Sequence, residues 1–316
     1  MNQVFAIAAA AGLASAFLSG LVTPGVSLLV PLTFIAPAPL MVAGLGWHPL
    51  VAALGGLFGC IGLSLMFGSK VALSFAVMVA IPAYLVAALV TWLMRTMPAD
   101  TPAPIAGRVF GTYVLGAIAV YAALAMLIGA LAIDTSYASF EARVAASFER
   151  MMLDFGRDSA AGAPDPMTMR RLSRMFVGIF APMASMLVAT VLTFSLWVSI
   201  RYLARAERLP FRRMPAHAIN LPREFVFALI GAMLVAQSGG FVGAFGASLT
   251  LTLLFMLMLN GLALIHQRTL GSNSRPMILA AVWILLLVFA PAALVYSFAG
   301  LLDALFGFRR NGEKTT

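Results

Sequence analysis

Long charge-free apolar runs alternate with short polar connections along this chain. No Asp, Glu, Lys or Arg occurs before Lys70, and later charge-free runs cover 71–94, 109–133, 175–200, 225–267 and 276–302. A membrane-crossing helix needs about 20 apolar residues. By that measure the first run holds three helices, the run 225–267 holds two, and each other run holds one. The pattern predicts an all-α polytopic transmembrane bundle with nine apolar segments: 4–21, 26–46, 50–67, 71–94, 109–133, 175–200, 225–235, 247–265 and 276–302.

A polar insertion divides the chain into three regions. Residues 1–133 hold the first five segments, and residues 134–174 form the insertion, with six acids and six arginines. Residues 175–316 hold the sixth segment, a basic loop at 201–223 and a C-terminal helical extension. Apolar residues at steps of three or four predict an amphipathic helix at 138–157. We expect it to lie on the membrane surface or cap the bundle, with a gate over a substrate opening as the alternative.

The stretch 29–60 bends within apolar sequence. It contains four prolines and several glycines but no charged residue. Each proline removes a backbone donor and interrupts a helix, and irregular backbone at membrane depth survives only beside protein or a cavity. A small molecule bound near Pro37 and Pro39 would satisfy the freed backbone groups. The sparse polar residues of the apolar zone add Tyr84, Asn260 and His266 as candidate ligand-binding residues.

The first segment carries a face of small residues. Ala8, Gly12, Ala16 and Gly20 recur every four positions. Such a face lets another helix backbone come close. It predicts either packing inside the bundle or a docking face for a partner membrane protein.

Composition and charge narrow the class of protein. Hydrophobic residues make up 62% of the 316 positions and charged residues 10%, and the mean hydropathy is +1.00, which excludes an ordinary soluble domain. The net charge of +9 falls in connections between apolar runs, a positive-inside pattern and not a nucleic-acid-binding surface. The single cysteine, Cys60, excludes a disulfide framework within this chain.

Catalytic chemistry is sparse. The three histidines have no second ligand at helical spacing, and no HExxH, GxSxG or GxxxxGK[ST] motif occurs. The acids of the insertion have no histidine beside them. The sequence predicts a protein that is not an enzyme and that uses no cofactor or metal.

The basic loops set the expected orientation. Placing 95–108 and 201–223 in the cytoplasm puts the insertion outside and the N-terminus inside. Three full crossings after Arg223 would leave the basic tail outside, whereas a re-entrant seventh segment would put Arg268 and Arg275 outside. We expect eight crossings with the tail inside, with nine as the alternative.

Four stretches resemble, in the same order, the YybS-like family of bacterial integral membrane proteins, a family defined by a domain of unknown function. They are IAPAPLMVAGLGWHPLVAALGG, IPAYLVAAL, NGLALIHQR and GLLDALFGFRR. The likeness spans nearly the whole chain. It implies a multi-pass protein of the bacterial inner membrane, and it carries no established activity.

The first six segments are also similar to the substrate-binding S components of energy-coupling-factor vitamin transporters. That resemblance rests on the small-residue first helix, the proline-broken second segment, the glycine-rich third helix and the count of six spans. It implies an S-component-like six-helix core followed by the C-terminal extension. Two functions remain open: binding of a small molecule for uptake, or a non-transporting scaffold or assembly factor that binds other membrane proteins. A cavity lined by polar groups would favour the first, and a filled core the second.

Overall fold

The structure is a computed structural model. It describes all residues except 1, 21–29, 99, 158–164, 211–215 and 309–316. The described residues form helices and connections without strands, which confirms the all-α prediction. Among them, six helical stretches are long and apolar enough to cross a membrane: Asn2–Gly20, Pro49–Phe67, Ser69–Thr96, Ala103–Ile133, Pro166–Arg205 and Gly240–Arg268.

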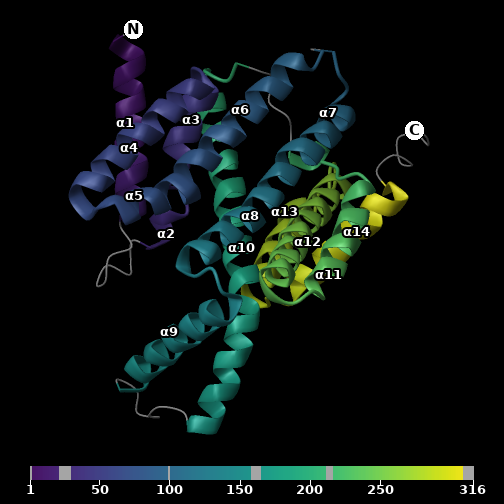
Figure 1. The fold of residues 1–316 in the computed structure, drawn as a ribbon. Coiled ribbons are helices and arrows are strands. Elements are labelled where there is room, and N and C mark those ends of the chain that lie inside the picture. The colour runs from purple at the N-terminus through teal and green to yellow at the C-terminus, as the bar shows by residue number, and fades with distance from the viewer. Residues whose placement is uncertain (1, 21–29, 99, 158–164, 211–215, 309–316) are drawn as a thin grey trace.

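These six stretches comprise most of the bundle (Figure 1). Two of them contain a π-helical turn within an otherwise continuous helix. The elements are α1 (Asn2–Gly20), α4 (Pro49–Phe67), α5 (Ser69–Phe75), η2 (Ala76–Ala80), α6 (Ile81–Thr96), α7 (Ala103–Phe110), η3 (Gly111–Leu115), α8 (Gly116–Ile133), α10 (Pro166–Arg205) and α12 (Gly240–Arg268). The remaining helices are α2 (Val30–Thr33), α3 (Ala38–Gly46), α9 (Tyr137–Arg157), η4 (Ala216–Ala218), α11 (Glu224–Ala236), α13 (Arg275–Val288) and α14 (Ala292–Phe306).

The second apolar segment is broken, as its prolines predict. Within its described part, α2 ends at Thr33 and α3 begins after Pro37, while residues 26–29 lie outside the described residues. Helix α3 packs in the centre of the bundle, between α1, α4, α6 and α10. Its side chains Leu40, Met41 and Leu45 are among the most deeply buried of the protein. The break therefore lies inside the protein core.

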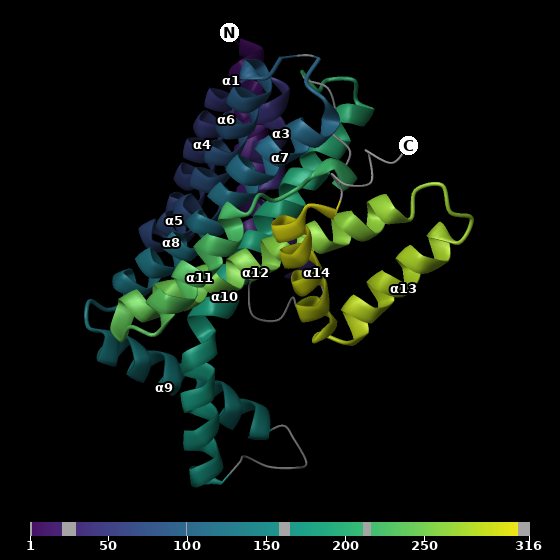
Figure 2. The ribbon, with the colours of Figure 1, turned by 90° about the vertical axis from the view of Figure 1, so that its right-hand side faces the viewer.

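The last apolar segment is not one helix, which corrects the prediction for 276–302. Helix α13 ends at Val288, and α14 begins after Pro291. Proline has no amide hydrogen to continue the ladder of α13. Figure 2 shows α13 and α14 as the two limbs of a V, of which α14 packs along α12. With 14 and 15 residues, each limb is shorter than the roughly 20 residues that span a bilayer.

Because of this V, the end of α14 lies near the start of α11 and the end of α12. The guanidinium of Arg223, at the start of α11, donates to the carbonyl of Leu305 at 2.9 Å, and Arg268, at the end of α12, donates to that of Phe308 at 3.4 Å. These contacts bring the start of α11 and the ends of α12 and α14 to one end of the bundle. The apolar V turns back on itself, so the end of α12 and the end of α14 lie at the same end of the bundle.

The other basic connections lie at this same end, which we call the basic end. The guanidinium of Arg208 lies 5.1 Å from the ring centre of Trp47, so the connection after α10 contacts the connection between α3 and α4. A Cβ at Gly107 would lie 1.8 Å from the carbonyl oxygen of Ala218, so the start of α7 touches the same region. At the opposite end, α4 passes into α5 through Gly68, and α11 turns into α12.

The polar insertion forms an arm instead of a cap over the bundle. Helix α10 continues for 40 residues, about 60 Å, and its N-terminal part projects beyond the other helices beside α9 (Figure 1). Asp165 caps α10 by accepting hydrogen bonds from the amides of Met167 and Thr168. The ring of Phe148 stacks on that of Phe176 with a centroid distance of 4.4 Å. The amphipathic helix predicted at 138–157 is thus present. The first part of its apolar face packs against α10, whereas Met151 and Phe155 are exposed.

Candidate functional site

The prolines proposed to bind a ligand lie beside protein hydrogen-bond donors. Pro37 is buried at the break between α2 and α3. The hydroxyl of Ser195 donates to the carbonyl of Phe34 at 3.1 Å. The hydroxyl of Ser199 lies 3.2 Å from the carbonyl oxygen of Ala38 and shares its single proton between that oxygen and the Ser195 carbonyl. Ser195 therefore satisfies at this break a carbonyl that a ligand was expected to satisfy, while Ser199, one turn later on α10, adds a bond to the first carbonyl of α3.

Asn260 is fully buried, and its amide joins three parts of the C-terminal region. Its side-chain oxygen accepts from the amide of Leu221 at 3.1 Å. Its nitrogen donates to the carbonyl of Gly300 at 2.9 Å and to a carboxylate oxygen of Asp303 at 3.4 Å. An unpaired amide would be costly in an apolar interior. Asn260 thus fastens α14 and the chain before α11 to α12.

The remaining predicted ligand-binding residues are dispersed. His266 bonds through Nδ1 to the carbonyl of Leu262 in its own helix, at 2.9 Å. Tyr84 is half-buried on α6, and Pro39 is half-buried on α3. Neither of the two cavities described below has any of the five predicted residues in its lining.

The small-residue face of α1 is occupied by α4. Ala8, Gly12 and Ala16 are buried. A Cβ on Gly12 would lie 1.9 Å from the carbonyl oxygen of Gly55, and a Cβ on Gly55 would lie 2.8 Å from that of Ala8. Gly20, where a Cβ would meet nothing within 4 Å, is the exception on this face. The face therefore packs inside the bundle, which is the first of the two alternatives that the sequence left open.

A cavity of about 440 Å³ opens at the end opposite the basic end. Its size falls in the range of roughly 300–1,000 Å³ that is typical of small-molecule sites. Four consecutive apolar segments contribute to it, from the ends of α1 and α4 to the start of the α5–η2 helix. The lining consists of Ser19, Gly20, Thr33, Ala36, Leu63, Lys70, Val71, Ser74, Phe75, Met78 and Val79.

The lining of this cavity combines an apolar wall with a few polar groups. Leu63, Phe75 and Val79 are buried, whereas Lys70 is exposed. Within the part of the chain that the structure describes, the Lys70 ammonium forms no ion pair or hydrogen bond. We refer to this site as the apolar cavity. Its groups suit a small amphipathic molecule whose anionic end meets Lys70.

The π-helical turn η2 forms part of the wall of the apolar cavity. A π-turn inserts one extra residue into a helix and displaces a backbone carbonyl, and such turns are frequent at functional sites. Here the hydroxyl of Tyr121, on α8, donates to the carbonyl of Val77 within η2. That hydrogen bond fixes the turn against α8, next to the lining residues Met78 and Val79.

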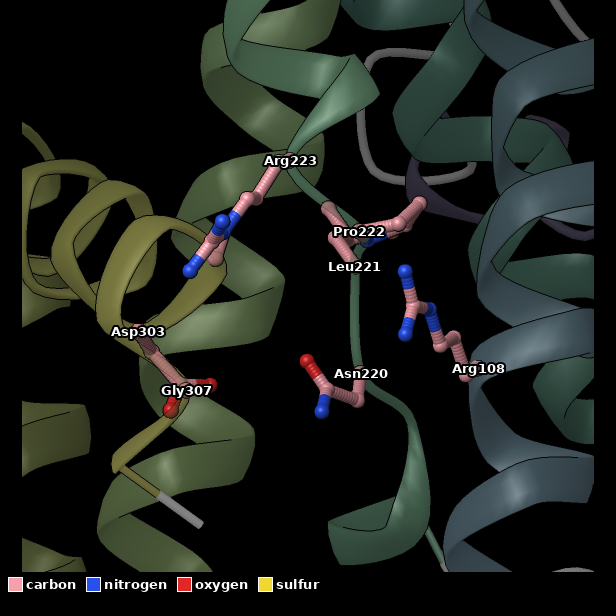
Figure 3. Close-up of a pocket in the computed structure, with 8 residues that line it drawn as sticks. Arg108, Asn220, Leu221, Pro222, Arg223, Asp303 and Gly307 are labelled. Atoms are coloured by element: carbon pink, nitrogen blue, oxygen red, sulfur yellow. The ribbon is translucent and has the colours of Figure 1, made fainter. Parts of the chain in front are cut away.

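A second, smaller cavity of about 180 Å³ lies at the basic end (Figure 3). Arg108 approaches it from α7, while Asn220 and Arg223 extend from the 219–223 segment toward α14. Asp303, which is 1% exposed, faces it from α14. Leu221, Pro222, Ala304 and Gly307 complete the lining. We call this site the polar cavity.

The described residues contain no candidate metal site. No three His, Cys, Asp or Glu side chains there lie close enough together to hold a metal ion.

Sequence reasoning missed both cavities for a physical reason. The apolar cavity is lined by residues from four segments, and only Lys70 stands out in the sequence, as the first charged residue of the chain. The polar cavity joins Arg108 and Arg223, which the sequence presents only as topology signals. Ser195 and Ser199 did carry a signal, because hydroxyls four residues apart lie on one helix face.

Comparison with known proteins places the chain in a family. No curated protein and no solved structure matches it significantly. A family model described as "Predicted membrane protein (DUF2232)" matches residues 13–304. This range includes every residue that lines the two cavities except Gly307. The match covers most of the chain, and the chain therefore belongs to this family of predicted membrane proteins.

Proposed function

We propose that this membrane protein binds a small amphipathic anion in the apolar cavity, as the substrate-binding subunit of an uptake system and without catalysing a reaction. The observation that carries the proposal is the cavity itself, which combines an apolar wall from Leu63, Phe75 and Val79 with the ammonium of Lys70, which has no partner among the described residues. A molecule with a carboxylate and an apolar body would pair its charge and bury its apolar surface there.

The distribution of arginines supports an outward-facing position for this cavity. Loops rich in Lys and Arg are retained in the cytoplasm. Arg95, Arg108, Arg205, Arg223 and Arg268 lie at the basic end or in the connections that form it. If the basic end is cytoplasmic, the N-terminus is cytoplasmic as well, and the apolar cavity opens on the outer side of a bacterial inner membrane. This arrangement agrees with the resemblance to S components.

The proposal can be tested by a substitution that places a large side chain in the apolar cavity. Val71 lines the cavity and is 42% exposed, while Leu73, two residues away on α5, is 63% exposed and does not line it. We expect medium-chain carboxylates to raise the melting temperature of the purified protein. Val71→Trp and Lys70→Gln should remove that shift, and Leu73→Trp should retain it.

The contradicting results are equally specific. If no carboxylate in a broad metabolite set stabilises the protein, and native mass spectra show no bound small molecule, the binding proposal fails. If Val71→Trp and Leu73→Trp respond alike to every ligand, binding occurs elsewhere.

One observation favours the alternative, a scaffold or assembly factor. Helix α13 is apolar, yet it has no buried residue, and Leu287 and Val288 are 82% and 81% exposed. A helix too short to cross the bilayer has its end at membrane depth, where exposed irregular backbone needs protein around it. A partner helix beside α13 would supply that cover. Photocrosslinking from position 287 in native membranes would capture such a partner, whereas crosslinks to lipid alone would exclude it.

A further inference from the structure

Two arginines and a buried acid meet in the polar cavity, which the proposed function does not use. Its lining comes from α7, the 219–223 segment and α14, which are far apart in the sequence (Figure 3). Close backbone contact holds these elements together, since a Cβ at Gly111 would lie 2.9 Å from the carbonyl oxygen of Asn220. The cavity is thus a consequence of the fold and does not depend on one flexible loop.

The arginines of the cavity have hydrogen-bond donors to spare. Arg223 uses its Nε to bond the Leu305 carbonyl, which leaves both terminal amino groups for another acceptor. In the described part of the chain, the Arg108 guanidinium and the Asn220 side chain have no hydrogen-bond partner. Guanidinium groups bind phosphate oxygens with charge-assisted, often paired hydrogen bonds. The donors therefore suit an anion with several oxygens.

Asp303 limits the charge of that anion. Its carboxylate is held by the Asn260 amide and faces the cavity that the two guanidiniums line. Among the described residues that line the cavity, two arginines and one aspartate sum to a single positive formal charge. A singly charged phosphodiester balances this site, whereas the second charge of a free phosphate at neutral pH would meet the carboxylate without compensation.

The size and surroundings of the cavity indicate where the phosphodiester comes from. At about 180 Å³ the cavity is smaller than sites that enclose a whole small molecule, so it admits a head group only. The exposed rings of Phe306 and Phe308 flank Gly307 at its rim, where acyl chains could lie against them. Basic pockets at the cytoplasmic ends of membrane helices bind anionic lipid head groups elsewhere. We propose that the polar cavity binds the phosphodiester head group of a membrane phospholipid.

The test uses the full chain in detergent with three probes: dioctanoyl phosphatidylglycerol, the soluble diester glycerophosphoglycerol, and inorganic phosphate. We expect the lipid to bind, as measured by native mass spectrometry and thermal shift. Arg108→Gln and Arg223→Gln should each weaken lipid binding about tenfold, the effect of losing one hydrogen bond between charged groups. Arg95→Gln is the matched control, because Arg95 is an exposed arginine of the last turn of α6 that does not line the cavity.

Each other result has a defined meaning. Equal weakening by Arg95→Gln would overturn the proposal, because it would show a general attraction to the basic end. Binding of the soluble diester as tightly as the lipid would overturn the lipid source. Failure of the lipid to bind the native protein would overturn the site. Because Arg108 is exposed and has no hydrogen-bond partner among the described residues, Arg108→Gln should keep the melting temperature of the native protein without lipid, which separates loss of binding from loss of fold. Arg223→Gln also loses the bond to the Leu305 carbonyl, so its melting temperature without lipid is measured beside its lipid binding.

Asp303→Asn tests the charge argument. It removes the negative charge while retaining an oxygen toward Asn260, so binding of inorganic phosphate should rise relative to the lipid. An unchanged preference in a variant that retains the native melting temperature would contradict the role given to Asp303.

Discussion

Two proline breaks interrupt apolar segments of this protein, and their surroundings are opposite. The break before α3 lies in the core, where Leu40 is fully buried and the hydroxyl of Ser195 on α10 reaches the freed carbonyl of Phe34. The break between α13 and α14 is surrounded by exposed side chains such as Leu287, at 82%. Proline determines where a helix ends, but the groups on neighbouring helices determine whether that end is enclosed by protein. The first break is therefore a structural joint, and the second presents a surface.

The largest difference in stability between the two breaks should come from replacing a leucine near each break by alanine. Leu40→Ala would leave a cavity in the core, and such substitutions cost about 2–5 kcal/mol. Leu287→Ala removes a side chain that touches little within this chain, and exposed substitutions stay within about 0.5 kcal/mol. Thermal unfolding of the purified protein in one detergent measures both. Equal losses would show that α13 packs against the bundle in solution.

The serines of α10 give the next largest effect. Ser195→Ala should leave the Phe34 carbonyl unsatisfied. Ser199→Ala removes the hydroxyl bond to the Ala38 carbonyl, which also accepts within α3, and should cost less. An acceptor left unsatisfied in an apolar interior costs about 1–3 kcal/mol. Thr190→Val is the control on the same helix, because the hydroxyl of Thr190 bonds only within α10, to the carbonyl of Met186 at 2.8 Å. If the two serine variants unfold at the temperature of the native protein, water or another group satisfies the break.

Much of the helical layout follows from where charges interrupt apolar sequence. The runs 71–94 and 109–133 correspond to the spans Ser69–Thr96 and Ala103–Ile133. The largest differences concern the sixth segment and the last one. Helix α10 begins at Pro166, and the signal was Asp165 followed by proline, an N-cap and a favoured first helical residue. The run 276–302 is longer than a crossing needs, and that surplus accommodates a turn at Pro291.

The site was far less predictable than the helices. Asn260 was correctly expected to need hydrogen-bond partners, but its partners Leu221 and Gly300 lie about 40 residues away in either direction. Contacts of this kind depend on how helices are placed around one another, and the periodicity within each segment does not encode that placement. The same limit applies to the apolar cavity, whose lining combines Lys70 with residues of α1, α2 and α4.

Glycine substitutions test a feature that the N-terminal and C-terminal regions share, which is close helix packing at a glycine: α1 packs on α4, and α14 packs on α12. A Cβ at Gly12 would lie 1.9 Å from the Gly55 carbonyl oxygen, and one at Gly300 would lie 1.9 Å from that of Leu257. Gly12→Ala and Gly300→Ala should each cost about 1–3 kcal/mol through overpacking. Gly20→Ala, which meets nothing within 4 Å, should be neutral or slightly stabilising because alanine favours helix. Thermal unfolding in detergent compares the three, and tolerance of Gly300→Ala alone would mean that α14 sits loosely on α12.

The smallest expected effect concerns the exposed limb of the V. With Cys60 replaced by serine, Leu287→Cys should leave the melting temperature in detergent unchanged within the range of a surface substitution, about 0.5 kcal/mol. In native membranes, the same thiol distinguishes lipid from protein around α13. A face in lipid should be quenched by nitroxide lipids when it carries a fluorophore, and a face covered by a partner should be shielded from them. Strong shielding would mean that the second break is enclosed after all, by another chain instead of by α10, and that the two breaks differ in the source of their cover and not in their need for it.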